Sequence, residues 1–172
     1  MDCIDTIKNR RSIRKYKTEE VDPQDVMTIL EAGRWAPSAG NFQPCHFIVV
    51  KDANKRKQLQ EAAMGQELLN TAPLVIVVCA DPERSSKYGE RGMKHFCLLD
   101  CANAAENMLL AAHSLGYGSC WMGGFSENGV KKVLGLPDDL RVVALVPIGK
   151  ADEDPVPPSR RPLDEIVHWD RW

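Results

Sequence analysis

The sequence predicts an α/β mixture, folded as one domain over residues 1–172, and three observations support this prediction. The chain has 172 residues and a mass of 19.2 kDa, which suits one domain and leaves little room for a second. Its 44% hydrophobic and 27% charged residues are ordinary globular values that argue against disorder. Apolar runs with strand character alternate with segments of helical periodicity, without internal repeats.

The first half of the chain begins this alternation. Asp22-Pro23 is typical of a helix start, because Asp caps free N–H groups and Pro suits the first helical turn. Residues 35–44 (WAPSAGNFQP) contain two prolines, a glycine and an asparagine, which favour a loop. We therefore expect helices over residues 3–9, 23–32 and 54–63, and strands over residues 47–50 and 74–80.

The second half carries the strongest helical signal, over residues 93–115. Apolar and small side chains occupy more than one face of this segment, so we expect it at the centre of the protein or against a second subunit. Gly116 is expected to end it. The polar residues before it, 81–92, predict a mobile surface loop. The remaining elements are a short strand over residues 117–120, a helix over 127–134 and a strand over 141–148.

Charge and hydropathy exclude several classes of partner. A net charge of −2 argues against nucleic-acid binding through bulk positive charge. No apolar run reaches the 18 residues of a membrane span, and the N-terminus lacks the apolar stretch of a signal peptide. The six cysteines are irregularly spaced, which favours reduced thiols. We expect a cytoplasmic protein that binds neither nucleic acid nor a membrane.

Two arginine clusters lie near the two ends of the chain. If the backbone is extended after the first helix, Arg10, Ser12 and Arg14 point the same way. Arginines that flank a hydroxyl suit a phosphate, because guanidinium groups donate paired, charge-assisted hydrogen bonds. The alternative is that these cations complement the dipole of the preceding helix. Arg160 and Arg161 lie between prolines, which stiffen the chain, although this segment could equally be a solvated tail.

Two loops between the clusters carry groups that could contact a ligand. In the segment 36–44, Ser38, Asn41 and Gln43 could read the edge of a polar ring, or the segment could be an ordinary connection. The segment 116–125 (GYGSCWMGGF) lacks the third glycine and the strand-turn-helix context of a dinucleotide fingerprint. Its Gly123-Gly124 pair can still present bare backbone N–H groups to a ligand.

The sequence offers no protein-borne catalytic group and no metal site. His95, Cys97 and Cys101 could meet on one helix, but no cysteine knuckle accompanies them. A serine-hydrolase elbow is absent from the sequence. Cys120 has no basic neighbour in the sequence that would activate it. We therefore predict neither a catalytic residue nor a metal ligand.

The order of these segments along the chain indicates which interpretation of the arginine clusters and loops to prefer. RRSIRKY, APSAGNFQP running into HFIVV, a long helix, GYGSCWMGGF and SRRPLDEIVHW together resemble the nitroreductase family of FMN-dependent oxidoreductases, over residues 4–169. The resemblance implies an α+β fold with a central, mainly antiparallel sheet flanked by helices. It also implies an intertwined homodimer with FMN at two interface sites, on which the C-terminal tail, residues 149–172, docks. Two tryptophans among the last four residues agree with a docked tail.

The resemblance also assigns roles to individual residues. For the FMN phosphate and ribityl chain it implies Arg10, Arg11, Ser12 and Arg14, with Arg160 and Arg161 completing the phosphate clamp. From the other subunit, the flavin ring would be reached by Pro37, Ser38, Ala39 and Asn41. The ring would also be lined by Met122, Gly123 and Gly124, with the amide of Gln66 at its edge. Gly123 stands where some members carry an acidic residue, and the segment 81–93 is shorter than in larger members.

The implied activity is a ping-pong cycle. NADH or NADPH would deliver a hydride to N5 of FMN, and a small-molecule acceptor such as a nitroaromatic or quinone would then be reduced. A flavin enzyme of the same fold with another reaction is the first alternative: reductive dehalogenation, flavin reduction or flavin fragmentation. The second alternative is a nucleotide- or anion-binding module without catalysis. The sequence alone does not choose the physiological acceptor.

Overall fold

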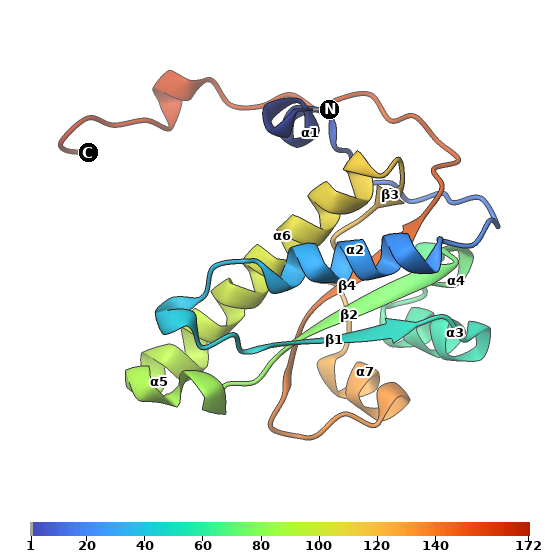
Figure 1. Cartoon of the computed structure of the whole chain (residues 1–172), viewed down its shortest axis with the longest axis horizontal. Helices are drawn as coiled ribbons and strands as arrows, with labels where there is room; N and C mark the ends of the chain where they lie inside the picture. Colours follow the sequence, from blue (N-terminus) through green and yellow to red (C-terminus); the bar gives the residue numbers. More distant parts are fainter. Residues whose placement is uncertain (1) are drawn as a thin grey trace.

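The computed structural model, which describes residues 2–172, contains a four-stranded antiparallel sheet in the order β1-β2-β4-β3 (Figure 1). The strands are β1 (Cys45–Val50), β2 (Leu74–Ala80), β3 (Gly118–Ser119) and β4 (Arg141–Gly149). The antiparallel sheet and the α+β class expected from the family resemblance are therefore confirmed.

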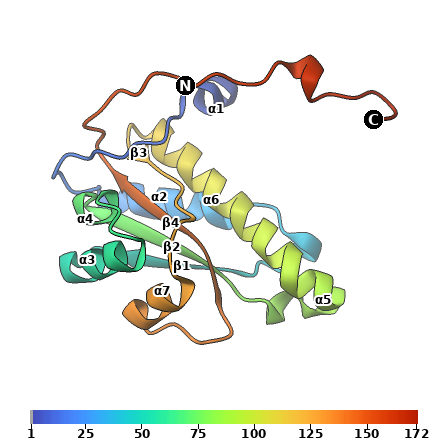
Figure 2. The same cartoon turned by 180° about the vertical axis from the view of Figure 1, so that it is seen from behind.

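Helices cover both faces of the sheet (Figures 1 and 2). The α-helices are α1 (Cys3–Asn9), α2 (Pro23–Arg34), α3 (Ala53–Ala62), α4 (Leu68–Thr71), α5 (Gly89–Arg91), α6 (Cys97–Ser114) and α7 (Glu127–Leu134). On one face α2 packs along α6, and on the other α3 contacts α4 and α7.

Strand β2 explains how the two layers are held. Every residue of β2 is buried, which suits a continuous apolar run with helices on both sides. Ile76 and Val78 face the cluster formed with α2 and α6, whereas Val75 and Val77 face the cluster formed with α3, α4 and α7. Because successive side chains of a strand point to opposite faces of the sheet, the apolar residues of β2 contribute to two hydrophobic clusters, one on each face.

The expected helix ends are confirmed at atomic detail. Asp22 accepts a hydrogen bond from the backbone N–H of Gln24, and Pro23 occupies the first turn of α2. After α6 the chain turns at Gly116, whose φ of 79° lies in the region that favours glycine. The expected helix over residues 127–134 has the same bounds in the structure.

The prediction of a mobile loop over residues 81–92 is wrong. The chain there forms a 3₁₀ segment (Glu83–Tyr88), α5, and a π-helical turn (Gly92–Phe96) that leads into α6. A Cβ on Gly92 would lie 2.1 Å from the carbonyl oxygen of Ser85, so these turns pack too closely for any larger residue. Polar composition indicated exposure correctly, but it did not reveal this close backbone packing.

Other differences from the predicted elements are small. The short helix α4 was not expected, and the strand expected over residues 117–120 is limited to β3. A 3₁₀ turn (Ala39–Asn41) lies inside the predicted loop at 35–44. None of the helices in residues 2–172 has the length and apolarity needed to cross a membrane.

The C-terminal tail leaves the sheet after β4 and passes beside α1 (Figures 1 and 2). Its only helical segment among the described residues is a 3₁₀ turn (Leu163–Glu165). Trp169 and Trp172 are 84% and 99% exposed. Within this one chain, the two tryptophans therefore do not bury their rings.

Candidate functional site

The two arginine clusters meet around one cavity. The chain becomes extended after α1, and the tail returns beside it, so residues from both ends enclose about 340 Å³. The lining residues are Arg10, Arg11, Ser12, Arg14, Pro155, Val156, Pro158 and Arg160. We call this space the arginine cavity.

The N-terminal side of the arginine cavity is fixed to β3. Ser12 forms a parallel bridge with Ser119, and the N–H of Ile13 donates to the carbonyl oxygen of Ser119 over 2.9 Å. Gly118 allows this approach, because a Cβ there would lie 2.7 Å from the Ile13 side chain. The extended segment predicted after the first helix is thereby held against the sheet.

The cavity is cationic. Within residues 2–172, no carboxylate forms an ion pair with the guanidinium of Arg10, Arg11, Arg14 or Arg160. Glu153 lies close by, but it accepts hydrogen bonds from the backbone N–H groups of Arg14 and Lys15. The positive charges are consequently left for an anion.

Two arginines of the predicted phosphate clamp, Arg11 and Arg161, have hydrogen-bond partners within the chain. Arg11 donates to the carbonyl oxygens of Lys8 at 2.7 Å and Arg10 at 2.8 Å, so the alternative interpretation as a partner of the helix end holds for this residue. Arg161 instead pairs with Glu165 at 3.2 Å and does not line the cavity. Of the C-terminal arginine pair, the cavity therefore receives Arg160.

The glycine turn follows β3 directly. The amide nitrogen of Gln66 donates to the carbonyl oxygen of Gly124 over 3.0 Å, which brings two of the predicted residues together. Gly123 is exposed, and among the described residues none accepts a hydrogen bond from its N–H. Met122 differs, because its backbone pairs with Leu145 and its side chain is buried in the core. Gly123 and Gly124 are thus the open part of this turn.

Cys120 has basic neighbours that its sequence context did not reveal. Burial raises the pKa of the Cys120 thiol, although the charges of Arg14 and Arg10 oppose the shift. The expectation of no basic partner is corrected, while the thiol stays protonated because burial outweighs the nearby arginines.

The predicted loop at 36–44 is held by a hydrogen bond within it and by another to α6. Ser38 Oγ accepts from the N–H of Gln43 at 3.0 Å, and Ala39 N–H donates to Asp100 Oδ1 at 3.1 Å. Asn41 has a φ of 56°, in the region where Asn is tolerated better than most residues. Pro37 and Ser38 line a second cavity of about 220 Å³. We call this the loop cavity.

Sequence reasoning missed Asp100. This side chain of α6 is only 6% exposed, and its second oxygen, Oδ2, has no hydrogen-bond partner among the described residues. Burial raises the pKa of this carboxyl, although the hydrogen bond from Ala39 opposes the shift. An aspartate inside the apolar helix pattern was the available signal, since a buried carboxylate requires a partner.

The loop and the arginine cavity lie apart in one chain. Both views place the 3₁₀ turn at residues 39–41 beside α5, and α1 with the tail at the other end of α6 (Figures 1 and 2). The arginine cavity and the loop cavity share no lining residue. The predicted site residues therefore form two separate groups in one protomer.

Comparison with known proteins places these features in a family. A model described as the nitroreductase family matches residues 7–68 and 60–150. The chain belongs to the nitroreductase family. An Archaeoglobus fulgidus relative named NADH dehydrogenase/NAD(P)H nitroreductase is 38% identical to it, over 99% of each chain.

Solved structures agree with this family membership. The nitroreductase family protein of Clostridium novyi has a TM-score of 0.82 and 34% identity, over 100% of this chain and 95% of that one. The NADPH:FMN oxidoreductase of Vibrio harveyi, solved with NAD+, has a TM-score of 0.91 and 30% identity, over 98% of this chain and 77% of the other. The resemblance seen in the sequence is confirmed.

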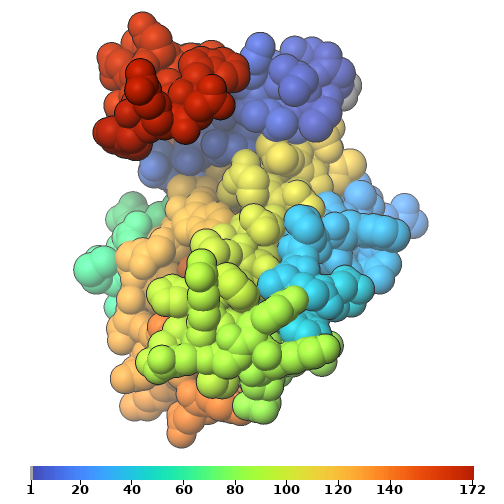
Figure 3. Space-filling view, turned by 90° about the vertical axis from the view of Figure 1, so that its left-hand side faces the viewer, coloured from blue at the N-terminus to red at the C-terminus, as the bar shows by residue number. Residues whose placement is uncertain are grey.

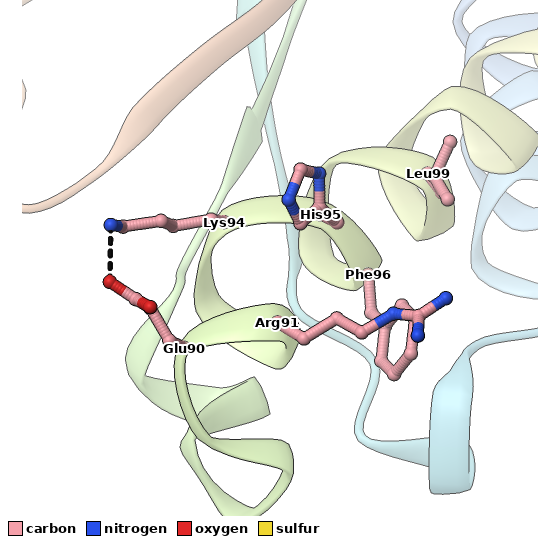
Figure 4. Close-up of a pocket in the computed structure, with 6 residues that line it drawn as sticks. All are labelled: Glu90, Arg91, Lys94, His95, Phe96 and Leu99. Carbon is pink, nitrogen blue, oxygen red and sulfur yellow. Dashed lines mark hydrogen bonds and ion pairs between the residues drawn. The ribbon is translucent and has the colours of Figure 1, made fainter.

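Another cavity lies near the loop at residues 36–44. Three aromatic rings run from the loop into it: Phe42 and Tyr88 have centroids 5.5 Å apart, and Tyr88 and Phe96 5.6 Å apart. The space-filling view shows the loop beside the segment that carries these rings (Figure 3). Beyond Phe96, a hollow of about 500 Å³ is lined by Glu90, Arg91, Lys94, His95, Phe96 and Leu99 (Figure 4). We call this the helix-start cavity.

The helix-start cavity carries both charge and apolar surface. Arg91 lies over the ring of Phe96 at 5.3 Å, and Lys94 forms an ion pair with Glu90 at 2.5 Å (Figure 4). Sequence analysis missed this cavity because it spans the boundary between the predicted loop at 81–92 and the predicted helix at 93–115. Arg91 and Lys94 come close together because the chain between them is helical.

Proposed function

We propose that this protein is an FMN-dependent oxidoreductase that passes reducing equivalents from NAD(P)H to a small acceptor such as a nitroaromatic or quinone. Membership of the nitroreductase family and the flavin and NAD(P)H named for its relatives support this function. The arginine cavity carries the proposal, because four guanidiniums without ion-pair partners, close to an open glycine turn, suit a phosphorylated cofactor.

The residues of the arginine cavity fit the phosphate end of FMN. A phosphomonoester carries a charge of about −1.5 to −2 at neutral pH. Arg10, Arg14 and Arg160 would neutralise it, and the hydroxyl of Ser12 would hydrogen-bond a phosphate or ribityl oxygen. Because β3 and the glycine turn continue from the Ser119 bridge, the flavin ring would lie along Gly123 and Gly124, with Gln66 behind them.

When bound, FMN would supply the redox chemistry, taking a hydride from NAD(P)H and then reducing the acceptor in a ping-pong cycle. The protein's own residues then bind and orient. The exposed N–H of Gly123 would donate a hydrogen bond to the ring, and the nearby arginine charges favour an anionic ligand. This division of labour agrees with the absence of a sequence motif for a protein-borne acid, base or nucleophile.

We further infer that each site takes its loop from a second copy of the chain. The segment Pro37 to Asn41 lies away from the arginine cavity within one protomer, so one chain cannot supply both. The exposed tryptophans of the tail and Leu99 of α6, 60% exposed, offer apolar surface for such a partner. A homodimer would cover this surface and complete two sites.

The helix-start cavity is our candidate entrance for the electron donor. It continues the aromatic row that begins at the loop, and Arg91 and Lys94 could face the phosphates of a dinucleotide. Phe96 offers a ring on which a base or nicotinamide can stack.

The function is tested by the visible spectrum of protein incubated with FMN, desalted, and titrated anaerobically with NADH and then NADPH. We expect a retained flavin spectrum that bleaches with at least one donor, and whose colour returns on adding a quinone. A flavin that remains bound but is not bleached would contradict the NAD(P)H step. Protein without flavin after desalting would contradict the cofactor assignment and favour the anion-binding module.

A further inference from the structure

Three of the six cysteines, Cys45, Cys97 and Cys101, gather between the sheet and the start of α6, outside the arginine cavity, and the side chain of Cys79 faces the opposite side of the sheet. Cys45 begins β1, Cys79 lies in β2, and Cys97 and Cys101 lie in the first turns of α6. The closest pair is Cys45 and Cys101, whose Sγ atoms are 3.0 Å apart. Residues 2–172 contain no cluster of His, Cys, Asp and Glu arranged to hold a metal ion.

The two sulfurs of the closest pair differ in access. Cys45 is partly exposed and lines the loop cavity, together with Ser38 and His46. Cys101 is fully buried behind it, with its Sγ also 3.5 Å from the carbonyl oxygen of Cys79. A small molecule that enters the cavity can therefore reach Cys45 directly, and it reaches Cys101 only through Cys45.

The geometry and the protonation states favour reaction in that order. A disulfide bond is about 2.05 Å long, so the pair needs a movement of about 1 Å to close. The hydrogen bond to Cys45 and burial raise the pKa of Cys101, and burial raises the pKa of Cys79 to about 12. These buried thiols stay protonated, and Cys45 is the sulfur that a molecule in the loop cavity can reach, so Cys45 attacks first.

We propose that Cys45 and Cys101 form a redox-active dithiol that is oxidised by a low-molecular-weight disulfide entering the loop cavity. The Cys45 thiolate attacks one sulfur of the small disulfide, which forms a mixed disulfide and releases a small thiolate. Cys101 then loses its proton to that thiolate and attacks Cys45 Sγ, which releases a second small thiolate that takes up the proton Cys45 gave up. Two protein thiols are oxidised to one disulfide, and one small disulfide is reduced to two thiols.

Formation of a Cys45–Cys101 disulfide would change the position of the loop at residues 36–44. Asp100, the neighbour of Cys101, holds Ala39 through a 3.1 Å hydrogen bond, and Pro37 and Ser38 line the same cavity as Cys45. A shift of Cys101 toward β1 would move this anchor. The consequence for cofactor binding rests on the proposed function, whereas the thiol chemistry does not.

The test follows the thiols directly. Reduced, FMN-treated protein is incubated with hydroxyethyl disulfide, its remaining thiols are trapped with an alkylating agent, and its peptides are mapped by mass spectrometry. We expect the thiols of Cys45 and Cys101 to be lost and one cross-link to join their peptides, reversed by dithiothreitol, whether or not the exposed Cys3 also carries an adduct. Because this readout needs no flavin, it is separate from the test of the proposed function.

Three variants sharpen the test. Cys101→Ser should trap a mixed disulfide at Cys45, and Cys45→Ser should form no Cys45–Cys101 cross-link. Cys3→Ser should form the same cross-link as wild type, because Cys3 lies in α1, outside this cluster. The proposal is overturned if wild-type protein reacts only at Cys3, or keeps an unresolved adduct on Cys45. A cross-link to Cys79 or Cys97 would also overturn it. The wild-type map decides even if a core variant fails to fold.

Discussion

Ser12 and Ser119 form a parallel bridge that joins the arginine segment after α1 to the short strand before the glycine turn. The adjacent hydrogen bond, from Ile13 N–H to the Ser119 carbonyl, fixes the same register. Two segments far apart in the sequence therefore lie on one side of the molecule at a defined offset. In the proposed function, this register would let one ligand place its phosphate at the arginines and its ring at Gly123.

Arg160→Ala should weaken FMN binding, and Arg161→Ala should not. Of these two residues, Arg160 lines the arginine cavity, whereas Arg161 pairs with Glu165. A charge-assisted hydrogen bond is worth about 1.5–3 kcal/mol, so the dissociation constant of Arg160→Ala should rise about 10- to 100-fold. Quenching of flavin fluorescence measures both constants. Equal losses in the two variants would indicate a general charge effect instead of a specific contact.

Gly118→Ala should disturb both stability and the site. The new Cβ would lie 2.7 Å from Ile13, so the N-terminal segment must shift away from β3. Overpacking of this kind costs about 1–3 kcal/mol in the free energy of unfolding. Urea unfolding measures the loss, and Gly123→Ala is the control, because a Cβ there meets only Trp121 at 4.0 Å. If Gly118→Ala were as stable as wild type, the register of the bridge would be in doubt.

Asp100→Asn should remove a pH dependence of stability. Burial raises the pKa of Asp100 in the folded protein above its value in the unfolded chain. The contribution of Asp100 to the free energy of unfolding is therefore fully present below the unfolded-state pKa, and it is lost as the pH rises through the folded-state pKa. Asparagine cannot ionise, yet its oxygen can still accept from Ala39 N–H. Free energies of unfolding should therefore fall less with rising pH in Asp100→Asn than in wild type.

The comparison variant for that prediction is Asp100→Leu, which removes the acceptor for Ala39 and should be less stable than Asp100→Asn at every pH. Identical pH slopes for wild type and Asp100→Asn would show that this carboxyl is not the group responsible.

Arg91→Ala should raise the KM for NADPH more than that for an uncharged dihydronicotinamide. The helix-start cavity supplies Arg91 beside Phe96, and only a donor with phosphates can use that charge. Loss of one exposed or partly exposed charge contact predicts a change of about 3- to 10-fold in KM. Steady-state kinetics with both donors measures it, and Lys132→Ala, exposed on α7, is the control. Equal changes in KM for the two donors would show that Arg91 does not contact the phosphates of the donor.

Much of the fold followed from local patterns. The apolar run of β2, the Asp22-Pro23 helix start and the helix at 127–134 each carry a strong local signal, and each is confirmed. The turns at 83–92 were not predicted, because the contacts that hold them, Tyr88 against Phe96 and the close approach at Gly92, join residues apart in the sequence. Such contacts join residues whose local sequence is polar and undistinguished.

The candidate site was predictable only in part. The spacing of Arg10, Ser12 and Arg14 indicated an anion site, and the cavity they share with Arg160 is a property of the tertiary structure alone. Gln66 and Gly124 meet through a hydrogen bond that no sequence spacing specifies. Asp100 escaped notice because an aspartate in a helix is usually exposed, and only the fold shows it beneath the loop.

The most direct test of the account compares FMN with riboflavin, which has the same ring and sugar chain but no phosphate. Both are titrated into the purified protein while flavin fluorescence is recorded. Several charge-assisted hydrogen bonds to one phosphate predict that FMN binds at least about 100-fold more tightly than riboflavin, and that Arg160→Ala narrows this difference. Equal affinities for FMN and riboflavin would contradict the assignment of the arginine cavity as the phosphate site.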